Sequence, residues 1–282
     1  MKDMMIGVIG TGTMGGGIAQ MFAENGFKVL LWDICEKFTA QGYENIAGRL
    51  DKSVEKGKLA ASDADAILKR ITVVNELSDL ASAGLIIEAI IEDFSTKKDL
   101  FSQLEKHLSP KTVIGSNTSS LSIGCLAETV SRKERFVGIH FFNPPTKLEL
   151  VEVISTPHSS PNALQQVNDV LAECGKRAVA VKDSPGFIVN RLLIPYINEA
   201  AKLIDEEVAD PDAIDTAMRL GALHPSGPLQ VADLIGLDIC KNILESLSVS
   251  LNNPSYKPAK SIVARVAAGH LGRKSGQGFY SY

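Results

Sequence analysis

Met5-Ile6-Gly7-Val8-Ile9-Gly10-Thr11-Gly12-Thr13-Met14-Gly15 is the stretch of sequence that decides the fold. A short apolar run leads into a glycine-spaced turn, and a pattern of helical spacing follows it. Gly10, Gly12 and Gly15 match G-x-G-x-x-G, in which the first glycine permits a tight turn and the second admits a pyrophosphate. The third lets the helix pack close to the strand. The free N–H groups at the start of this helix, around Thr13 and Met14, would face the anion.

An acidic residue after the next strand strengthens the interpretation as a dinucleotide site. Gly26 is expected to follow the first helix, and the strand Phe27–Trp32 ends at Asp33. The separation along the chain between Gly15 and Asp33 is about that at which a carboxylate binds the ribose 2′-OH. Ile34 and Cys35 come next, and no arginine stands beside Asp33 to bind a 2′-phosphate. We therefore predict NAD rather than NADP. The alternative to a dinucleotide site is that the glycine motif is only an ordinary strand–helix turn.

The composition is that of an ordinary globular chain. Of its 282 residues 45% are hydrophobic and 22% are charged, and the net charge of −4 argues against nucleic acid as a partner. No apolar run is long enough for a membrane span, and no cleavable leader is evident. The cysteines are far apart and predict neither a metal site nor disulfides, so we expect a reducing, cytoplasmic location. They are Cys35, Cys125, Cys174 and Cys240.

The order of the patterns predicts two domains. Apolar runs alternate with helical patterns as far as His140, which indicates an α/β fold with a doubly wound, mostly parallel sheet of Rossmann type. The run 149–154 follows too closely for a crossover helix, so its strand should be antiparallel to its predecessor. From Phe187 onward the patterns are helical. We predict a dinucleotide-binding domain over 1–183 and an all-α domain over 184–282.

The second domain offers several local expectations. Pro195 should kink its first helix, and Asp210-Pro211 should begin the next one. Residues 229–247 and 259–268 are expected to form two further helical stretches. A strand is indicated only at 278–280.

His140 and Glu152 are the first candidates for catalysis. If the strands of residues 136–140 and 149–154 form a hairpin centred on Thr146, the two side chains lie directly opposite each other. Cross-strand partners are within side-chain reach. A carboxylate at one imidazole nitrogen fixes the tautomer, so the other nitrogen can accept a proton from an alcohol as hydride leaves the same carbon. A core histidine or a surface ion pair are the alternatives.

Two polar residues could contact the substrate. Ser119 follows a strand and could donate a hydrogen bond to a substrate oxygen, or it could cap the helix expected near Leu121. Asn190 lies at the start of the second domain, where a cleft between domains would bind substrate.

Charged residues suggest further contacts. Lys52, Lys56 and Lys58 are either a solvated helix end or a patch for the phosphates of a long anionic substrate. Glu92 and Lys97 follow the strand that ends at Ala89, where the ribose and nicotinamide end of a dinucleotide would pass. The alternative for this pair is an ordinary capped helix start.

The chain resembles the L-3-hydroxyacyl-CoA dehydrogenases, most of all bacterial 3-hydroxybutyryl-CoA dehydrogenases, in collinear order over essentially its whole length. The H-F-F-N-P and P-G-F-I-V-N-R elements are specific, whereas the glycine loop alone is not. The matching segments are Gly10–Gly15 with Asp33, Ser116–Leu121, His140–Pro144, Leu150–Ile154, Ser184–Arg191, His224–Pro228 with Asp233 and Gly236–Asp238, and Leu271–Tyr280.

This resemblance implies an oxidoreductase that interconverts (S)-3-hydroxyacyl-CoA and 3-oxoacyl-CoA with NAD. It implies a His140–Glu152 dyad and a homodimer that forms through the helical domain. We expect no metal, because His140 would supply the proton chemistry and NAD would accept the electrons. By the same resemblance Ser119 and Asn190 hold the substrate, and Lys52 and Lys56 meet its CoA part. The residues that would touch NAD are Gly10, Gly12, Thr13, Met14, Gly15, Asp33, Ala89, Glu92, Lys97, Ser119, Asn143 and Lys274.

The loop between the two hairpin strands departs from the family pattern. The family reads N-P-x-P-x-M-K-L, but residues 143–150 here read Asn-Pro-Pro-Thr-Lys-Leu-Glu-Leu. Two alternatives to an acyl-CoA enzyme stay open at this stage. One is a related dehydrogenase of a free 3-hydroxyacid, and the other is a non-catalytic dinucleotide-binding structural or sensor protein.

Overall fold

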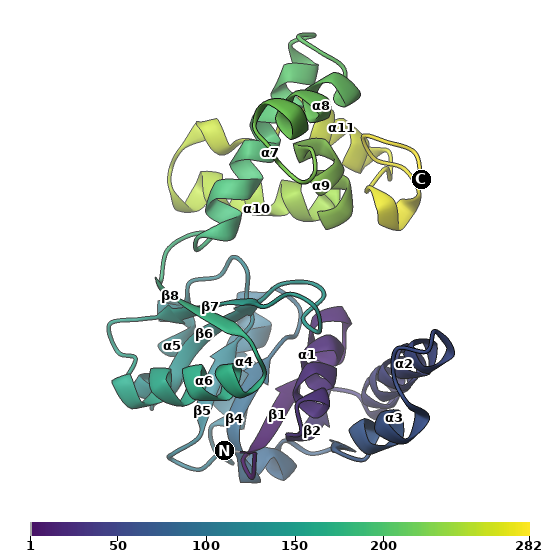
Figure 1. The fold of residues 1–282 in the computed structure, drawn as a ribbon. Helices are drawn as coiled ribbons and strands as arrows, with labels where there is room; N and C mark the ends of the chain where they lie inside the picture. Colours follow the sequence, from purple (N-terminus) through teal and green to yellow (C-terminus); the bar gives the residue numbers. More distant parts are fainter. Residues whose placement is uncertain (1) are drawn as a thin grey trace. The chain divides into compact units, whose positions relative to one another are not determined.

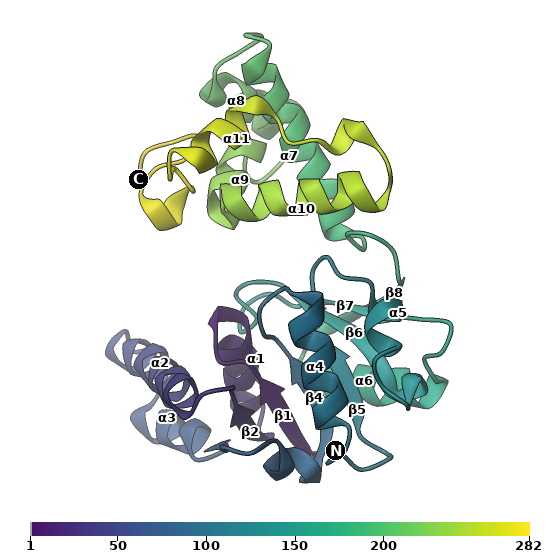
Figure 2. The same ribbon diagram turned by 180° about the vertical axis from the view of Figure 1, so that it is seen from behind.

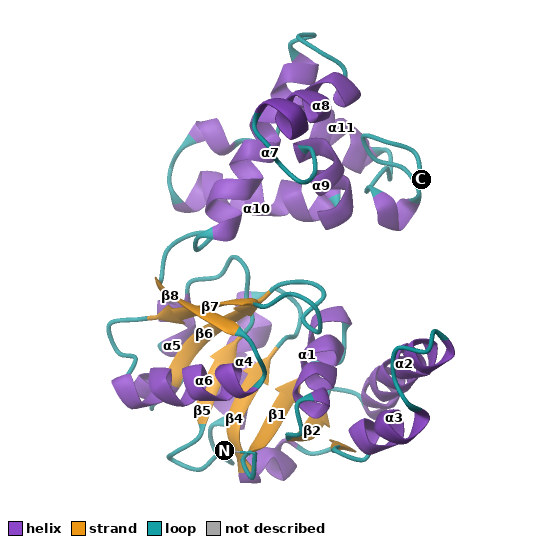
Figure 3. Ribbon diagram, viewed as in Figure 1, coloured by secondary structure: helices purple, strands orange, loops and turns teal. Residues whose placement is uncertain are grey.

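The computed structural model describes residues 2–282. The chain forms two compact units, and the boundary between them along the sequence lies between Asp183 and Ser184. The first unit contains the strands and the second consists of helices and loops (Figure 3). Among the described residues, no helix combines the length and the apolar character needed to cross a membrane.

The first unit is built on an eight-stranded sheet of order β3-β2-β1-β4-β5-β6-β7-β8. Only β6 and β7 pair antiparallel, and the other neighbours are parallel. The predicted doubly wound sheet with an antiparallel 149–154 strand is thus confirmed. The strands are β1 Met5–Ile9, β2 Lys28–Trp32, β3 Ile71–Val73, β4 Ala83–Glu88, β5 Val113–Ser116, β6 Phe136–Phe141, β7 Leu150–Ser155 and β8 Arg177–Lys182.

Helices cover both faces of this sheet, so its central strands β1, β4, β5 and β6 are almost entirely buried. Figure 1 shows α1 and α6 in front of the strands, and the reverse view shows α4 in front of them (Figure 2). Phe22 of α1 packs edge-to-face against Phe27 and against Phe141 of β6, so the core extends across the sheet. The helices are α1 Thr13–Glu24, α2 Glu36–Glu55, α3 Ala61–Leu68, α4 Phe94–Leu104, α5 Ile123–Ala127 and α6 Pro161–Glu173.

The register brings four chain segments to one edge of the sheet. Ile9 pairs with Glu88, Glu88 with Ser116, and Ser116 with Gly138. The segments that follow β1, β4, β5 and β6 therefore leave the sheet side by side at its carboxyl edge. Ligands of doubly wound sheets bind at this edge.

The second unit has its own apolar core between helices. Asp210 caps α8 with Pro211 at its first position, as predicted. Pro195 lies inside α7, the helix that it is expected to kink. The predicted continuous helix 229–247 is wrong, because Gly236, at φ 107°, separates α9 from α10. The strand expected at 278–280 is absent from the described residues. Gln277 forms isolated antiparallel β-bridges with Gly272 and Ser281 instead. The helices are α7 Val189–Asp205, α8 Pro211–Gly221, α9 Pro228–Ile235, α10 Leu237–Ser250 and α11 Lys260–Ala267.

Candidate active site

The glycine loop has the backbone that a dinucleotide requires. Gly10 has φ +95°, and a Cβ there would lie 2.5 Å from the carbonyl oxygen of Ala89. A Cβ on Gly15 would collide with the carbonyl oxygen of Gly10, so the first turn of α1 packs directly on the loop. At Gly12, the N-cap of α1, a Cβ would meet no atom within 4 Å. This open side is where an anion can reach the N–H groups of the helix start, which include those of Thr13 and Met14.

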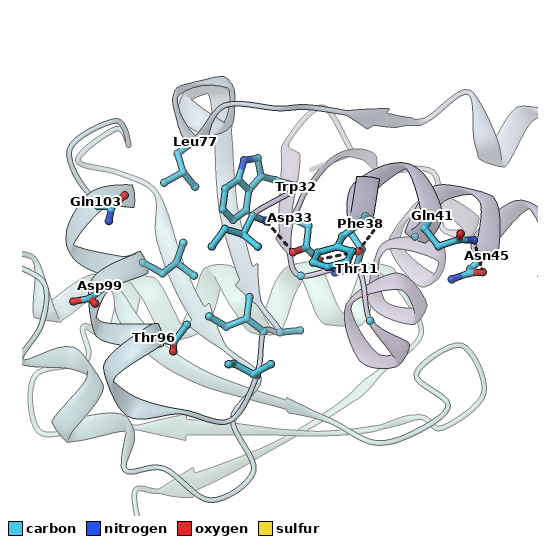
Figure 4. Close-up of a pocket in the computed structure, with 18 residues that line it drawn as sticks. Thr11, Trp32, Asp33, Phe38, Gln41, Asn45, Leu77, Thr96, Asp99 and Gln103 are labelled. Atoms are coloured by element: carbon cyan, nitrogen blue, oxygen red, sulfur yellow. Dashed lines mark hydrogen bonds between the residues drawn. The ribbon is translucent and has the colours of Figure 1, made fainter. Parts of the chain in front are cut away.

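A pocket of about 780 Å³ opens beside this loop. Gly10, Gly12, Asp33 and Ala89 line it, together with residues of α2 and the apolar segment after β4. Figure 4 labels Asp33 with Phe38, Gln41 and Asn45 of α2. The carboxylate of Asp33 accepts hydrogen bonds from Thr11 and from the N–H of Ile34. A mostly apolar cleft with one fixed carboxylate fits the adenosine part of NAD.

His140 and Glu152 form a buried pair in the first unit. They are direct partners in the β6–β7 register, and His140 Nδ1 lies 2.7 Å from Glu152 Oε2. Their side chains are 5% and 1% exposed, so the interpretation as a surface ion pair is wrong. The ring of Phe142 lies 4.6 Å from the imidazole ring, centroid to centroid. A carboxylate at Nδ1 assigns the N–H to that nitrogen and leaves Nε2 as the proton acceptor.

Ser119 belongs to a turn that Glu92 holds. Glu92 Oε1 accepts hydrogen bonds from the N–H groups of Ser119 and Ser120 and from the hydroxyls of Thr118 and Ser120. Burial raises the pKa of Glu92, but Lys97 and these hydrogen bonds outweigh it and keep the pKa below its ordinary value. The helix cap predicted as the alternative for Ser119 is wrong, since Ser122 caps α5 through its side chain.

Lys97 lies between two carboxylates at the start of α4. Its Nζ is 2.5 Å from Glu88 Oε1 and 3.4 Å from Glu92 Oε2, and the side chains of Lys97 and Glu88 are 1% and 0% exposed. Asp93, not Glu92, caps α4. Ser116 donates a hydrogen bond to the other oxygen of Glu88. Buried charges persist only when paired and hydrogen-bonded, so these groups fix the strand ends that carry the site.

The loop after His140 is held from two sides. The N–H of Phe141 donates to Asn117 Oδ1, which ties the end of β6 to the end of β5. Lys176 donates to the carbonyls of Pro145 and Leu148. A Cβ on Gly17 of α1 would lie 2.8 Å from Pro145. The unusual sequence of this loop therefore packs tightly, while Asn143 is exposed.

The remaining predicted residues lie elsewhere. Asn190 is half-buried in the first turn of α7, in the second unit. Lys274 belongs to the second unit too and forms an ion pair with Asp238, 2.6 Å away. Lys52 and Lys56 are exposed at the carboxyl end of α2. The structure thus brings His140 and Glu152 together and places Ser119 after the neighbouring strand.

Sequence reasoning missed the supporting residues Glu88, Asn117 and Lys176. Glu88 could have been found, because an acid at the end of an otherwise apolar buried strand needs a cation, and Lys97 follows it nine positions later. Asn117 and Lys176 act through backbone groups of distant segments, which no local pattern marks.

Comparison with known proteins identifies the family of the chain. The NAD-binding domain of 3-hydroxyacyl-CoA dehydrogenase matches residues 5–184, and the C-terminal domain of the same family matches residues 186–282. The chain belongs to the 3-hydroxyacyl-CoA dehydrogenase family. It is accordingly an enzyme, an NAD-dependent 3-hydroxyacyl-CoA oxidoreductase, which confirms the predicted family, activity class and cofactor.

Several family members are similar over their whole length. A probable 3-hydroxybutyryl-CoA dehydrogenase of Deinococcus radiodurans is 44% identical over 99% of this chain and all of its own. The 3-hydroxybutyryl-CoA dehydrogenase of Bradyrhizobium diazoefficiens is 42% identical over 98% of this chain and 94% of its own. The crystal structure of (S)-3-hydroxybutyryl-CoA dehydrogenase from Ralstonia eutropha superposes with a TM-score of 0.93 at 41% identity, covering 99% of this chain and 98% of that one.

Proposed function

We propose that the chain interconverts (S)-3-hydroxybutyryl-CoA and acetoacetyl-CoA, with His140 as the general base and Glu152 as the residue that orients it. The buried hydrogen bond of 2.7 Å between His140 Nδ1 and Glu152 Oε2 carries this proposal. The short-chain substrate is suggested by the bacterial relatives, whose names specify the butyryl thioester.

The dyad supplies the proton chemistry of the reaction. His140 Nε2 takes the proton of the C3 hydroxyl during oxidation and returns it during reduction, and Glu152 stabilises the imidazolium formed in between. NAD, when bound, accepts or supplies the hydride. Burial of both side chains strengthens their attraction, because few water molecules compete with it.

Other residues position the substrate in this proposal. The hydroxyl of Ser119 binds the C3 oxygen, and its backbone is fixed for this task by Glu92. Asn190 assists on the thioester side, and Asn143, Lys97 and Lys274 contact NAD. The exposed ammonium groups of Lys52 and Lys56 bind CoA phosphates.

A kinetic comparison tests the role of His140. The wild type should oxidise NADH with acetoacetyl-CoA, faster than with longer 3-oxoacyl-CoAs. His140→Ala should lower kcat by about 10²–10⁴-fold, the usual contribution of a positioned base. His107→Ala, at an exposed histidine on the surface, is the matched control and should keep the wild-type kcat. A His140→Ala enzyme with nearly normal kcat would contradict the mechanism.

Reversing the charges of Lys52 and Lys56 tests the CoA contact separately. The double change to glutamate should raise KM for acetoacetyl-CoA and leave kcat nearly unchanged, since the phosphates lie far from the reacting carbon. Lys106→Glu, at another exposed lysine, should leave KM unchanged. An unchanged KM for acetoacetyl-CoA would contradict the contact of these two lysines with CoA, and a higher kcat/KM for free acetoacetate than for acetoacetyl-CoA would favour a free 3-hydroxyacid as the substrate.

Assembly and location complete the proposal. The enzyme acts as a homodimer in the cytoplasm, in keeping with its four free cysteines. Burial raises the pKa of Cys174 and of Cys240 to about 12, so these two thiols stay protonated at neutral pH.

A further inference from the structure

Thr11 holds the carboxylate of Asp33 by two hydrogen bonds. Its N–H and its Oγ1 each lie 2.8 Å from Asp33 Oδ2, and the N–H of Ile34 lies 2.8 Å from Oδ1. A carboxylate offers about four lone-pair positions. Protein hydrogen bonds therefore occupy three of these lone-pair positions. The fourth, on Oδ1, is left over, and Asp33 lines the pocket.

The Thr11 side chain is itself fixed by α2. Its Oγ1 also lies 2.9 Å from the carbonyl oxygen of Phe38, and Figure 4 places Asp33, Thr11 and Phe38 side by side in the pocket wall. One hydroxyl proton serves only one acceptor, and the charged carboxylate is the stronger of the two. A Cβ on Gly42 would collide with the Thr11 side chain, so glycine at position 42 leaves the room that Thr11 fills.

We propose that Thr11 is a positioning residue that sets the preference for NAD over NADP by keeping the Asp33 carboxylate turned into the pocket. A ribose 2′-OH can donate to the remaining lone pair of Oδ1. A 2′-phosphate is mostly deprotonated at neutral pH, so it is a poor donor to the carboxylate, and its negative charge is repelled by that of Asp33. A carboxylate free to rotate would move away from the phosphate, whereas the three hydrogen bonds, two of them on Oδ2 from Thr11, oppose this rotation. The preference thus rests on repulsion of NADP as well as on attraction of NAD.

The test is the ratio of Kd for NADPH to Kd for NADH, measured by fluorescence titration of the purified enzyme. Thr11→Ala keeps the backbone hydrogen bond and removes the hydroxyl. It should lower the ratio about tenfold, the factor expected for one hydrogen bond to a charged group. Thr11→Ser restores the hydroxyl and should keep the ratio within about twofold of the wild type. Gly42→Ala, which displaces Thr11, should change the ratio in the direction of Thr11→Ala.

The outcomes separate positioning from structural support. If Thr11 were merely structural, Thr11→Ala would weaken the binding of NADH and NADPH equally and leave the ratio unchanged. This result would overturn the proposal. So would a Thr11→Ser enzyme that behaves like Thr11→Ala. Asp33→Ala gives the ratio without a carboxylate and sets the largest change possible. The proposal requires NAD to bind in this pocket, but the titration needs no substrate, so it stands or falls independently of the acyl group.

Discussion

At the scale of single residues, the proposed mechanism depends on the negative charge of Glu152, which burial makes more effective. Glu152 is 1% exposed and lies against Nδ1 of His140. Glu152→Gln keeps the shape and an acceptor oxygen but removes the charge that stabilises the imidazolium. We expect kcat to fall by roughly 10²-fold with little change in KM for NADH, because the NAD pocket is untouched. Steady-state kinetics check this, with Glu149→Gln, an exposed neighbour before the same strand, as the control. Equal kcat for Glu152→Gln and the wild type would show that the carboxylate serves only folding.

A second residue-scale prediction concerns Glu92 and acid. Its folded-state pKa is held below the ordinary value of 4.5 by Lys97 and by hydrogen bonds from residues 118–120, against the opposing effect of burial. A lowered pKa contributes stability that is present above the unfolded pKa and lost as the pH falls through the folded one. Glu92→Gln should therefore lower Tm at pH 7, and the difference from the wild type should shrink below about pH 4.5. Thermal melts across this range measure it, and a Tm difference independent of pH would contradict it.

At the scale of elements, the sequence predicted what local patterns encode. Alternating apolar runs gave the sheet, and the short 141–149 connection gave the antiparallel β7, with His140 opposite Glu152. The prediction failed where a single residue decides between two structures that have the same apolar pattern. Nothing in the apolar pattern of 229–247 separates a helix from two helices with Gly236 between them. Nor does the serine-rich run after β5 show whether Ser119 or Ser122 is the cap. The interlocking of Glu88, Lys97 and Glu92 depends on distances between segments, which a linear sequence does not display.

The break at Gly236 supports an element-scale prediction with an internal control. Gly236 has φ +107°, and a Cβ there would lie 2.9 Å from Asp238 Oδ1 and 3.0 Å from Lys274 Nζ. Gly236→Ala should destabilise the enzyme by about 1–3 kcal/mol, the usual cost of a side chain in a backbone conformation reserved for glycine. Gly48 lies within α2, and a Cβ there would meet no atom within 4 Å. Gly48→Ala should stabilise by roughly 0.5–1 kcal/mol. Urea unfolding of both variants checks the opposite signs, and two changes of the same sign would refute the argument.

At the scale of the whole molecule, exposed apolar side chains have different explanations in the two units. In the first unit, Ile34, Phe38 and Ile91 are exposed, but all three line the NAD pocket and a bound dinucleotide would cover them. In the second unit, Leu220 is 75% exposed and Leu223 is 87% exposed, and neither lines the pocket of the first unit. We propose that these two leucines, three positions apart, belong to an interaction surface, as larger exposed apolar patches do. A second copy of the chain is the occupant that the proposed homodimer provides.

This assignment predicts the mass of the enzyme in solution. The wild type should have twice the mass of one chain by light scattering. Leu220→Lys and Leu223→Lys together should lower the mass to that of one chain, because burying two charges in an apolar interface is unfavourable. Leu148→Lys is the matched control, since Leu148 is an exposed leucine of the first unit, and it should keep the wild-type mass. A wild type with the mass of one chain would refute the dimer. A doubly substituted enzyme that stays dimeric would place the interface on another face of the helical unit.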